Sequence, residues 1–414
     1  MKNVIVIGGG IIGVCSAYFL QKSGHQVTLV DQSDMNHGAS YINAGYVCPS
    51  HLTPLAAPGV LKQGVRWMLN QKSPLYVKPR LNADFLKWSR AFYSSCSAKN
   101  VTKGIPAIKS IALLGKELYT EIKEEEKLSF DIENKGLLMI CQTEKMLEEE
   151  IEIAHMAEKE GLSIEVLSPN DISNKQPNTT IKAKGAVLYL GDQHMIPSQF
   201  MNEIKGNLQK SGVQFLLNEK VEDISVSDAK IVDIQTTQQV LKAEEYVFAA
   251  GAWTPSLSKK TGVSLLVQAG KGYSINTDQD IGITIPSILC ESKIAVTPMK
   301  NFTRFAGTME IAGINQTINT ARVEAIAMAS KRYFTDLQLS PKEKKEASCG
   351  LRPVSPDGLP YIGKSKKCKN LTIATGHAMM GWTMGPSTGK LVAELISGKK
   401  PSIPIDAFHP DRRF

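Results

Sequence analysis

The sequence predicts an α/β (α+β) fold in which a domain with a parallel sheet is interleaved with a second, mostly antiparallel domain. Three observations support this class. Residues 2–31 read as strand, glycine-rich turn, helix and strand; the middle of the chain changes to proline-punctuated loops, helices and further strands; and residues 370–398 return to a strand, a glycine-rich loop and a helix. A length of 414 residues allows two or three domains at the usual size of roughly 150 residues.

The first element is KNVIVIGGGIIGVCSAYFLQKSGHQVTLVD, residues 2–31. The apolar run VIVI is followed at once by GGGIIG, then by a helical pattern that ends at Gly24, and the strand QVTLV closes on an acid. In such a fingerprint Gly8 makes the tight turn, Gly10 lets a pyrophosphate approach the backbone, and Gly13 lets the helix pack on the strand. The segment therefore predicts a Rossmann-like unit that binds a dinucleotide.

The helix and the terminal acid indicate how the dinucleotide binds. Ile11 and Ile12 begin the helix, whose N-terminus faces the phosphates with the positive end of its dipole. Asp31 stands where an acid accepts hydrogen bonds from the ribose hydroxyls, which fits NAD or FAD and disfavours NADP. The fingerprint alone does not separate NAD from FAD. Because only one fingerprint occurs, we expect electrons to leave to something other than a nicotinamide.

The middle of the chain predicts the second domain. Proline-rich segments at 54–59 and 72–81 read as loops. Helices are expected at 82–96, 105–126, 144–161, 197–212 and 318–333, and strands at 135–140, 164–167, 185–190, 213–218 and 244–253 and through much of 263–308, with a β-meander up to residue 242. The acidic run in 144–161 is interpreted as a solvated helix face.

Composition excludes several classes of protein. The net charge of +8 is mild and its positive residues are scattered, so nucleic acid is not an expected partner. Seven cysteines without a CxxC pair indicate reduced thiols, a cytoplasmic location and no metal site. The first strand begins almost at once, so we expect no signal peptide, and the absence of 18 or more consecutive apolar residues argues against a membrane span.

Three further segments resemble one family. HGASYINAGYV (37–47) is similar to the G-x-S-x-x-N-A-G loop of the D-amino-acid oxidase/dehydrogenase superfamily of flavoproteins, GHAMMGWTMGPSTG (376–389) to its G-H-x-x-x-G-W-T-M loop, and GLRPVSPDGLPYIG (350–363) to its G-L-R-P-x-T-P-D-G-x-P-x-I-G motif. The resemblance spans nearly the whole chain, from GGGIIG to FHPDRRF, and is closest to the D-amino-acid dehydrogenase branch. It implies FAD as the cofactor.

The resemblance and the order of elements set the expected domain boundaries. The FAD-binding domain comprises residues 1–50, 191–220, 243–260 and 345–414, and the substrate domain comprises residues 51–190, 221–242 and 261–344.

The resemblance also implies which residues contact the cofactor. The loop at 37–47 passes alongside the flavin, and the glycines of 376–389 let the backbone turn against the ring, with helix 385–396 directing N–H groups at the edge where negative charge develops. Besides the fingerprint, the implied contacts are Ser40, Asn43, Gly45, Val221, Gly251, Trp253, Gly376, His377, Gly381, Trp382 and Thr383. His377 is as well explained by support of the loop as by chemistry.

Arg352 is the leading candidate for substrate binding. It follows an apolar run and precedes two prolines, so we expect it on a proline-stiffened turn after a strand. In the family this arginine grips the substrate carboxylate, and its planar fork of donors matches a carboxylate bidentately. The alternative is a structural ion pair with Asp357.

Three other residues are weaker catalytic or pocket candidates. Tyr273 either donates its hydroxyl to the substrate carboxylate or is a buried strand aromatic, and Tyr46 either lines the pocket or packs under the flavin-side loop. His51 either discriminates between substrates or is an ordinary loop histidine. Arg304 and Glu310 are expected to share a face of one strand in structural roles.

The implied function is oxidative deamination by a FAD-dependent D-amino acid dehydrogenase, in which hydride passes from the substrate Cα to flavin N5 and the imino acid hydrolyses to a 2-oxo acid. Electrons then pass to a quinone or another respiratory acceptor, which allows peripheral contact with the inner face of the membrane. Two alternatives stay open: a glycine/sarcosine-type oxidase that uses dioxygen, and a non-catalytic flavin-binding subunit of a complex. The methionines of 376–389 and the CPSH segment suggest a snug apolar pocket and D-proline or hydroxy-D-proline as substrate.

Overall fold

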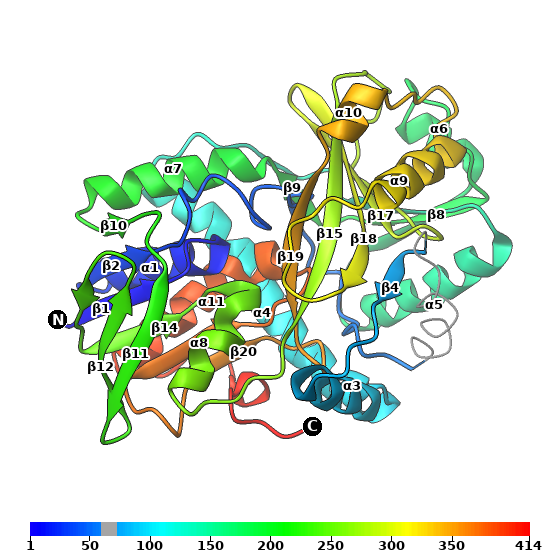
Figure 1. Ribbon diagram of the computed structural model, residues 1–414. Helices are drawn as coiled ribbons and strands as arrows, with labels where there is room; N and C mark the ends of the chain where they lie inside the picture. Colours follow the sequence, from blue (N-terminus) through cyan, green and yellow to red (C-terminus); the bar gives the residue numbers. More distant parts are fainter. Residues whose placement is uncertain (59–72) are drawn as a thin grey trace.

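The structure of the chain, a computed structural model, describes residues 1–58 and 73–414. Its first domain holds a six-stranded sheet in the order β10 (Gln214–Leu216), β2 (Gln26–Val30), β1 (Asn3–Ile7), β14 (Glu245–Phe248), β21 (Leu371–Thr375) and β20 (Tyr361–Lys364), seen at the left of Figure 1. All strand pairs are parallel except β20 with β21. The strand–helix–strand unit predicted at 2–31 therefore forms the middle of this sheet, and the predicted α/β class is confirmed.

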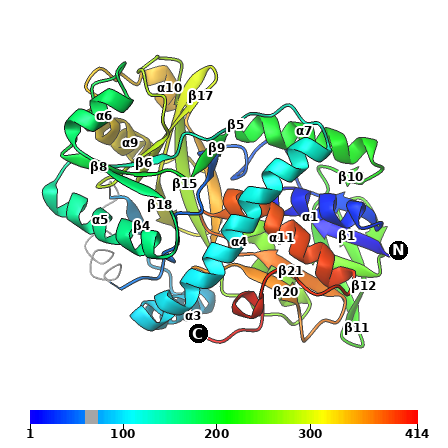
Figure 2. The ribbon, with the colours of Figure 1, turned by 180° about the vertical axis from the view of Figure 1, so that it is seen from behind.

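Four helices cover one face of this sheet. They are α1 (Ile11–Lys22), α4 (Ala98–Glu125), α7 (Pro197–Lys210) and α11 (Gly381–Ile396), and Figure 2 shows the long α4 crossing in front of α11. Val4 and Val6 of β1 share a hydrophobic core with these helices, whereas Ile5 and Ile7 belong to a second core on the other face. The separation follows because successive side chains of a strand alternate between the two faces.

The other face packs against a small antiparallel sheet formed by β11 (Val221–Ser227), β12 (Lys230–Thr236) and β13 (Val240–Leu241). Ile224, Ile231 and Ile234 share the second core with β1 and β14. This packing differs from the expected placement of 221–242 in the substrate domain, because the apolar side of the meander packs against the nucleotide-binding sheet and α8 (Thr254–Lys260).

The second domain is built on a nine-stranded, mostly antiparallel sheet. Its order is β19 (Ser348–Val354), β15 (Gln268–Thr277), β18 (Phe302–Ile311), β17 (Ile294–Met299), β16 (Ser287–Leu289), β6 (Leu137–Cys141), β8 (Gly185–Tyr189) and β7 (Ile164–Leu167), and β4 (Leu75–Val77) pairs in parallel with β18. Helix α9 (Thr320–Tyr333) packs on β15 and β18, and α5 (Glu144–Lys159) and α6 (Pro169–Lys175) pack beside β6, β7 and β8.

The remaining elements connect the two domains. A three-stranded sheet contains β3 (Tyr46–Val47), β9 (Gln193–Met195) and β5 (Ile132–Glu133). The short helices are α3 (Ala83–Ser95), α8 (Thr254–Lys260), α10 (Pro341–Lys345), η1 (Gly251–Trp253) and η2 (Asp406–Phe408). No helix in the part of the chain that the structure describes has both the length and the apolar character needed to cross a membrane.

Several predicted elements are displaced. Helix α11 begins at Gly381, four residues before the predicted 385, because the glycines that suggested a loop are helical and allow close packing: a Cβ on Gly385 would lie 2.8 Å from Ile11 Cγ1, and one on Gly389 2.5 Å from the backbone of Cys15. Helix α4 begins at Ala98 rather than 105, where the Ser97 side chain caps it.

The proline-rich and acidic segments also differ from the predicted structure. Strand β4 lies in the predicted loop 72–81, and the ends of the two loop predictions at residues 59 and 72 lie outside the described residues. Arg352 and Pro353 lie within β19 rather than on a turn; the proline is accepted there because β19 is an edge strand, paired only with β15. Glu150 in the acidic helix α5 is buried at 4% exposure instead of being solvated.

Candidate active site

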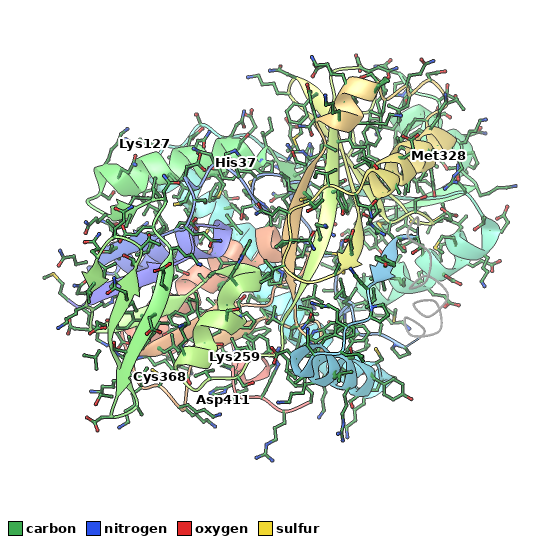
Figure 3. The ribbon with its side chains drawn as sticks, in the orientation of Figure 1. His37, Lys127, Lys259, Met328, Cys368 and Asp411 are labelled. Atoms are coloured by element: carbon green, nitrogen blue, oxygen red, sulfur yellow. The ribbon has the colours of Figure 1, made fainter. Side chains whose placement is uncertain are left out.

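One cavity of ≈1080 Å³ runs between the two domains. Every candidate site residue lines it except Gly13, Gly45 and Gly376. His37 lies at its rim, where Figure 3 labels it, and its ring contacts Asp34 with Nδ1 3.0 Å from the carboxylate. The structure therefore gathers residues from both ends of the sequence and from its middle around a single space.

The nucleotide end of the cavity is built from the loop between β1 and α1. Gly8 has a positive φ of +108°, and a Cβ on Gly13 would lie 1.7 Å from the Gly8 carbonyl oxygen, so neither position accepts a side chain. The Asp31 carboxylate accepts hydrogen bonds from the Gly9 N–H at 2.6 Å and the Ser33 N–H at 2.8 Å. These bonds fix the acid beside the glycine turn, where it retains lone pairs for a ligand.

The loop at 37–47 is tied to two helices. Ser40 Oγ accepts from the Ile11 N–H at 2.9 Å, and Trp382 Nε1 donates to the Ser40 carbonyl at 2.9 Å. Asn43 Oδ1 accepts from the Gly45 N–H at 2.8 Å; Gly45 itself packs against β9, where a Cβ would lie 2.0 Å from the Met195 carbonyl oxygen. Gly45 therefore supports the loop and does not face the cavity.

The C-terminal loop brings a buried imidazole and a helix end to the same cavity. Gly376 has a φ of +86°, and the following His377 is buried, with Nε2 2.9 Å from Thr388 Oγ1 and no partner at Nδ1. Burial lowers the pKa of His377 to about 3, so the ring is neutral. Helix α11 begins at Gly381 without a side-chain cap, which leaves backbone N–H groups at the cavity wall.

These features fit a flavin dinucleotide. The glycine turn with the uncapped N-terminus of α1 would hold a pyrophosphate, and Asp31 would hold the adenosine ribose. The loops at 37–47 and 376–383 would enclose the ring, and two buried polar atoms without partners, His377 Nδ1 and Thr308 Oγ1, belong to residues that line this same space.

Arg352 reaches the cavity from β19. Its NH1 donates to the Thr308 carbonyl at 2.7 Å, and the guanidinium lies over Gly272, where a Cβ would be 2.4 Å from Cζ. Burial lowers the pKa of Arg352 to about 10, which leaves it charged at neutral pH.

Among the described residues no carboxylate lies within ion-pair distance of the Arg352 guanidinium. The proposed partner Asp357 instead binds Arg412, through Nε at 2.7 Å and NH2 at 2.9 Å. The ion-pair alternative is therefore wrong, and Arg352 presents a half-buried positive charge to the cavity.

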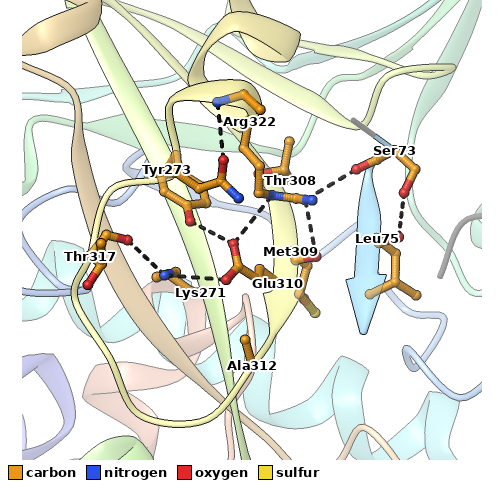
Figure 4. Close-up of polar contacts among 12 residues, drawn as sticks. Ser73, Leu75, Lys271, Tyr273, Thr308, Met309, Glu310, Ala312, Thr317 and Arg322 are labelled. Atoms are coloured by element: carbon orange, nitrogen blue, oxygen red, sulfur yellow. Dashed lines mark hydrogen bonds and ion pairs between the residues drawn. The ribbon is translucent and has the colours of Figure 1, made fainter. Parts of the chain in front are cut away.

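Figure 4 shows a cluster of charged side chains, Lys271, Glu310 and Arg322, the last of which belongs to α9. Glu310 accepts from the Tyr273 hydroxyl at 2.7 Å, with Lys271 Nζ at 3.4 Å and Arg322 Nε at 3.9 Å. Lys271 also donates to the Thr317 carbonyl at 2.8 Å. The Tyr273 hydroxyl is thus donated to Glu310, rather than to a ligand in the cavity as one reading of the sequence expected.

The geometry of this cluster depends on a bulge at Thr308. Thr308 has a φ of +60°, and the pairing of β15 with β18 shifts between Lys271 and Tyr273. The bulge reverses the alternation of side chains, so Glu310 joins the α9 side. Arg304, before the bulge, donates to the carbonyls of Tyr41 at 2.9 Å and Asn43 at 2.7 Å in the flavin-side loop. The expectation that Arg304 and Glu310 share a face is wrong for this reason.

Tyr46 and His51 line the cavity from the segment after the flavin-side loop. The Tyr46 hydroxyl lies 2.9 Å from the carbonyls of both Ser287 and Val296, so its proton is committed to the sheet. His51 is half-buried, and desolvation lowers its pKa to about 4. A neutral His51 can donate or accept a hydrogen bond within the cavity.

Sequence reasoning missed several cavity residues. Gly272 leaves room for the Arg352 guanidinium, and the Thr308 carbonyl accepts a hydrogen bond from it. No pattern in the sequence marks either residue. At the far end of the cavity Glu150 accepts from the Tyr189 hydroxyl at 3.0 Å, and Lys293 lines the same wall. Met379 and Met380 both line the cavity, as expected, although Met379 is 48% exposed.

The fold brings one dinucleotide-type glycine turn and the Arg352 guanidinium to a single cavity. The family profile described as FAD dependent oxidoreductase (DAO) matches residues 3–395, and the chain belongs to this family. The predicted cofactor, FAD, and the predicted family are therefore confirmed.

Curated relatives extend the comparison. The D-amino acid dehydrogenase of Vibrio atlanticus (strain LGP32) is 32% identical over 417 residues, with 98% of each chain covered. That of Helicobacter pylori is 31% identical over 398 residues, with 95% of this chain and 94% of the relative covered.

Solved structures show the same fold. Glycine oxidase from Geobacillus kaustophilus superposes with a TM-score of 0.79 at 20% identity, covering 100% of this chain and 99% of that one. L-proline dehydrogenase from P. horikoshii gives a TM-score of 0.74 at 18% identity, covering 99% and 96%.

Proposed function

We propose that the protein oxidises a D-amino acid to its imino acid, with FAD as cofactor and Arg352 as the clamp for the substrate carboxylate. The observation that carries this proposal is a half-buried, desolvated guanidinium without a described counter-ion beside the FAD site. A buried charge is costly unless it is paired, and a substrate carboxylate supplies the missing anion. The D-configuration is supported by the curated relatives, which are named D-amino acid dehydrogenases.

The side chains of the site bind and orient the substrate. FAD, when bound, supplies the hydride acceptor. Arg352, held by the Thr308 carbonyl, fixes the carboxylate and so limits the positions of Cα. The hydroxyls of Tyr46 and Tyr273 donate to protein groups, so neither has its proton free for the substrate. The candidate imidazoles of His51 and His377, with pKa values of about 4 and about 3, are weak bases, which fits a substrate that arrives with a neutral amine.

The polar far wall bears on the substrate side chain. Glu150, Tyr189 and Lys293 place hydrogen-bonding groups there, which gives little support to a purely apolar pocket made for D-proline. D-proline and hydroxy-D-proline stay predictions to be tested beside polar D-amino acids. A quinone or another respiratory acceptor, with peripheral contact at the inner membrane face, is the proposed route for the electrons.

An anaerobic titration tests the proposal. The purified holoprotein is mixed with D- and L-amino acids, including the prolines, and the absorbance of the oxidised flavin is followed. Near-stoichiometric bleaching by D-amino acids is expected. Bleaching by no amino acid overturns the proposed function, or, if a partner restores it, identifies the chain as a subunit that needs a complex. Rapid reoxidation in air with release of hydrogen peroxide would identify a dioxygen-using oxidase instead.

The role of Arg352 is tested with a second ligand pair. A bleaching D-amino acid and its carboxamide have the same side chain, but the carboxamide lacks the negative charge and has an NH2 donor in place of one carboxylate oxygen. The wild-type protein should prefer the acid strongly, and Arg352→Met should lose that preference. Arg412→Lys, which alters another largely buried arginine bound to Asp357, is the control and should keep it.

A further inference from the structure

The segment that follows β3 brings a thiol and an imidazole next to a carboxylate from a distant turn. Cys48 comes directly after β3, His51 lies three residues later, and Asp192 lies in the turn between β8 and β9. One ligand atom from each of these residues lies within 4.8 Å of the others. Cys48 and Asp192 are buried and His51 is half-buried.

These three donors match one kind of metal ion. Thiolate, imidazole and carboxylate are the ligands of Zn²⁺, whereas Mg²⁺ and Ca²⁺ take oxygen ligands throughout. Bond lengths of about 2.0–2.3 Å place the ligand atoms of a tetrahedral Zn²⁺ site about 3.3–3.6 Å apart. The ligand atoms of the three residues lie within 4.8 Å of one another, so side-chain movements of roughly 1 Å would bring them to these separations.

The surroundings hold the donors in place. The Cys48 N–H donates to Thr383 Oγ1 at 3.0 Å, which ties this segment to α11. Ser50 donates to Asp192 through its N–H at 3.2 Å and through its hydroxyl, so the carboxylate is already oriented by hydrogen bonds. Asp192 is also anchored through its carbonyl, which accepts from the Gly136 N–H at 3.1 Å.

The position of the group gives such a site an open side. Cys48 and His51 line the large cavity, while Asp192 lies behind them. Three protein ligands leave the fourth position of a tetrahedral ion free, and sites of that kind bind water or a small ligand there. We propose that Cys48, His51 and Asp192 form a Zn²⁺ site in the cavity wall, with its open position toward the substrate space.

This assignment contradicts the expectation of a chain without a metal site. Cys48 and His51 show no recognised zinc spacing, and Asp192 is 144 positions from Cys48, so only the fold joins the three (192 − 48 = 144). Metal binding at these residues does not depend on the identity of the amino acid that the enzyme oxidises.

Two measurements on the FAD-loaded protein test the site. Equilibrium dialysis against Zn²⁺ with metal analysis should give one tightly bound ion per chain. Co²⁺ in its place should give tetrahedral d–d absorption at wavelengths longer than the oxidised flavin band. Failure of the wild-type protein to bind either ion overturns the proposal and leaves the group as a hydrogen-bonded anchor of the segment.

Variants identify the ligands. Cys48→Ser and Asp192→Asn should each weaken Zn²⁺ binding by at least about tenfold, and Cys48→Ser should remove the thiolate-to-Co²⁺ charge-transfer band. Cys96→Ser changes a half-buried cysteine outside the group and should leave both readouts unaltered. Flavin content and the thermal midpoint show whether each variant is folded. A Co²⁺ spectrum that survives in Cys48→Ser would assign the ion to another place.

The effect on flavin reduction completes the test. Because the open position faces the substrate space, Zn²⁺ should slow bleaching of the flavin by its amino acid, and a chelator should restore the rate. The inhibition should occur in the wild-type and Cys96→Ser proteins and be absent from Cys48→Ser. Equal inhibition of Cys48→Ser would overturn the assignment.

Discussion

A methyl group added to Gly272 should displace Arg352, the proposed carboxylate clamp, without touching any ligand. A Cβ on Gly272 would lie 2.4 Å from Arg352 Cζ and 2.5 Å from both NH1 and NH2. Ordinary contacts between carbon atoms are about 3.5–4.0 Å, so the guanidinium must move by about 1 Å or more. Gly272 has no positive φ, and alanine introduces no backbone strain there.

The size of the effect follows from that displacement. A misplacement of about 1 Å in a positioning group can cost about 100-fold in rate. We expect Gly272→Ala to lower kcat/KM for the amino acid by about that factor, because the fork no longer meets the carboxylate and its bond to the Thr308 carbonyl is strained. The preference for the acid over its carboxamide should fall in parallel.

The same strand supplies a matched control. Gly270 lies two residues earlier on the same face of β15, and the three atoms nearest to its added Cβ belong to Val354, with Cγ2 at 2.8 Å, and to the Met309 side chain, at 3.3 Å. Gly270→Ala should therefore cost about 1–3 kcal/mol of stability through overpacking and leave acid selectivity intact. Steady-state kinetics and thermal unfolding of both variants decide the matter. Unchanged kcat/KM in Gly272→Ala, or equal losses in both variants, would refute the proposed position of the clamp.

Three further predictions follow from other parts of the structure. Asp31→Ala should raise the Kd for FAD by about 10- to 100-fold, measured by fluorescence of released flavin, since the acid is fixed beside the glycine turn; unchanged retention would contradict its role. Glu310→Gln should lower the free energy of unfolding, measured in urea, by about 3–5 kcal/mol, because buried Lys271 and Arg322 lose the negative charge beside them. Tyr273→Phe, which removes only a hydrogen bond to Glu310, should lower it by about 1–2 kcal/mol. The pKa of His377 is lowered to about 3 in the folded chain, whereas an unfolded histidine binds a proton near pH 6.5. The free energy of unfolding should therefore fall as the pH drops from 6.5 toward 3, by about 2 kcal/mol at pH 5. The variant His377→Asn should lack this part of the pH dependence.

Local sequence order was a reliable guide wherever the interacting residues are neighbours in the chain. Residues 2–31 contain strand, glycine turn, helix and acid in one run, so the contacts among them join residues close together in the sequence. The same holds for α5 and α7, whose ends lie within two residues of the predicted ones. The glycines at the start of α11 were wrongly predicted to form a loop for the opposite reason. Gly385 and Gly389 allow close packing against α1, which lies at the other end of the sequence.

The candidate site shows the same division. Motifs in the sequence predicted the cofactor and the family, both confirmed, and placed Arg352 at the cavity that the structure shows. Only the tertiary structure decided what surrounds Arg352. Asp357 forms an ion pair with Arg412, and the Tyr273 hydroxyl donates a hydrogen bond to Glu310. The bulge at Thr308 turns Glu310 to the far side of the sheet. These outcomes depend on strand register and on partners far apart in the chain. A shift of one residue in register sends a side chain to the opposite face, and one bulge does the same, which no local pattern in this sequence records.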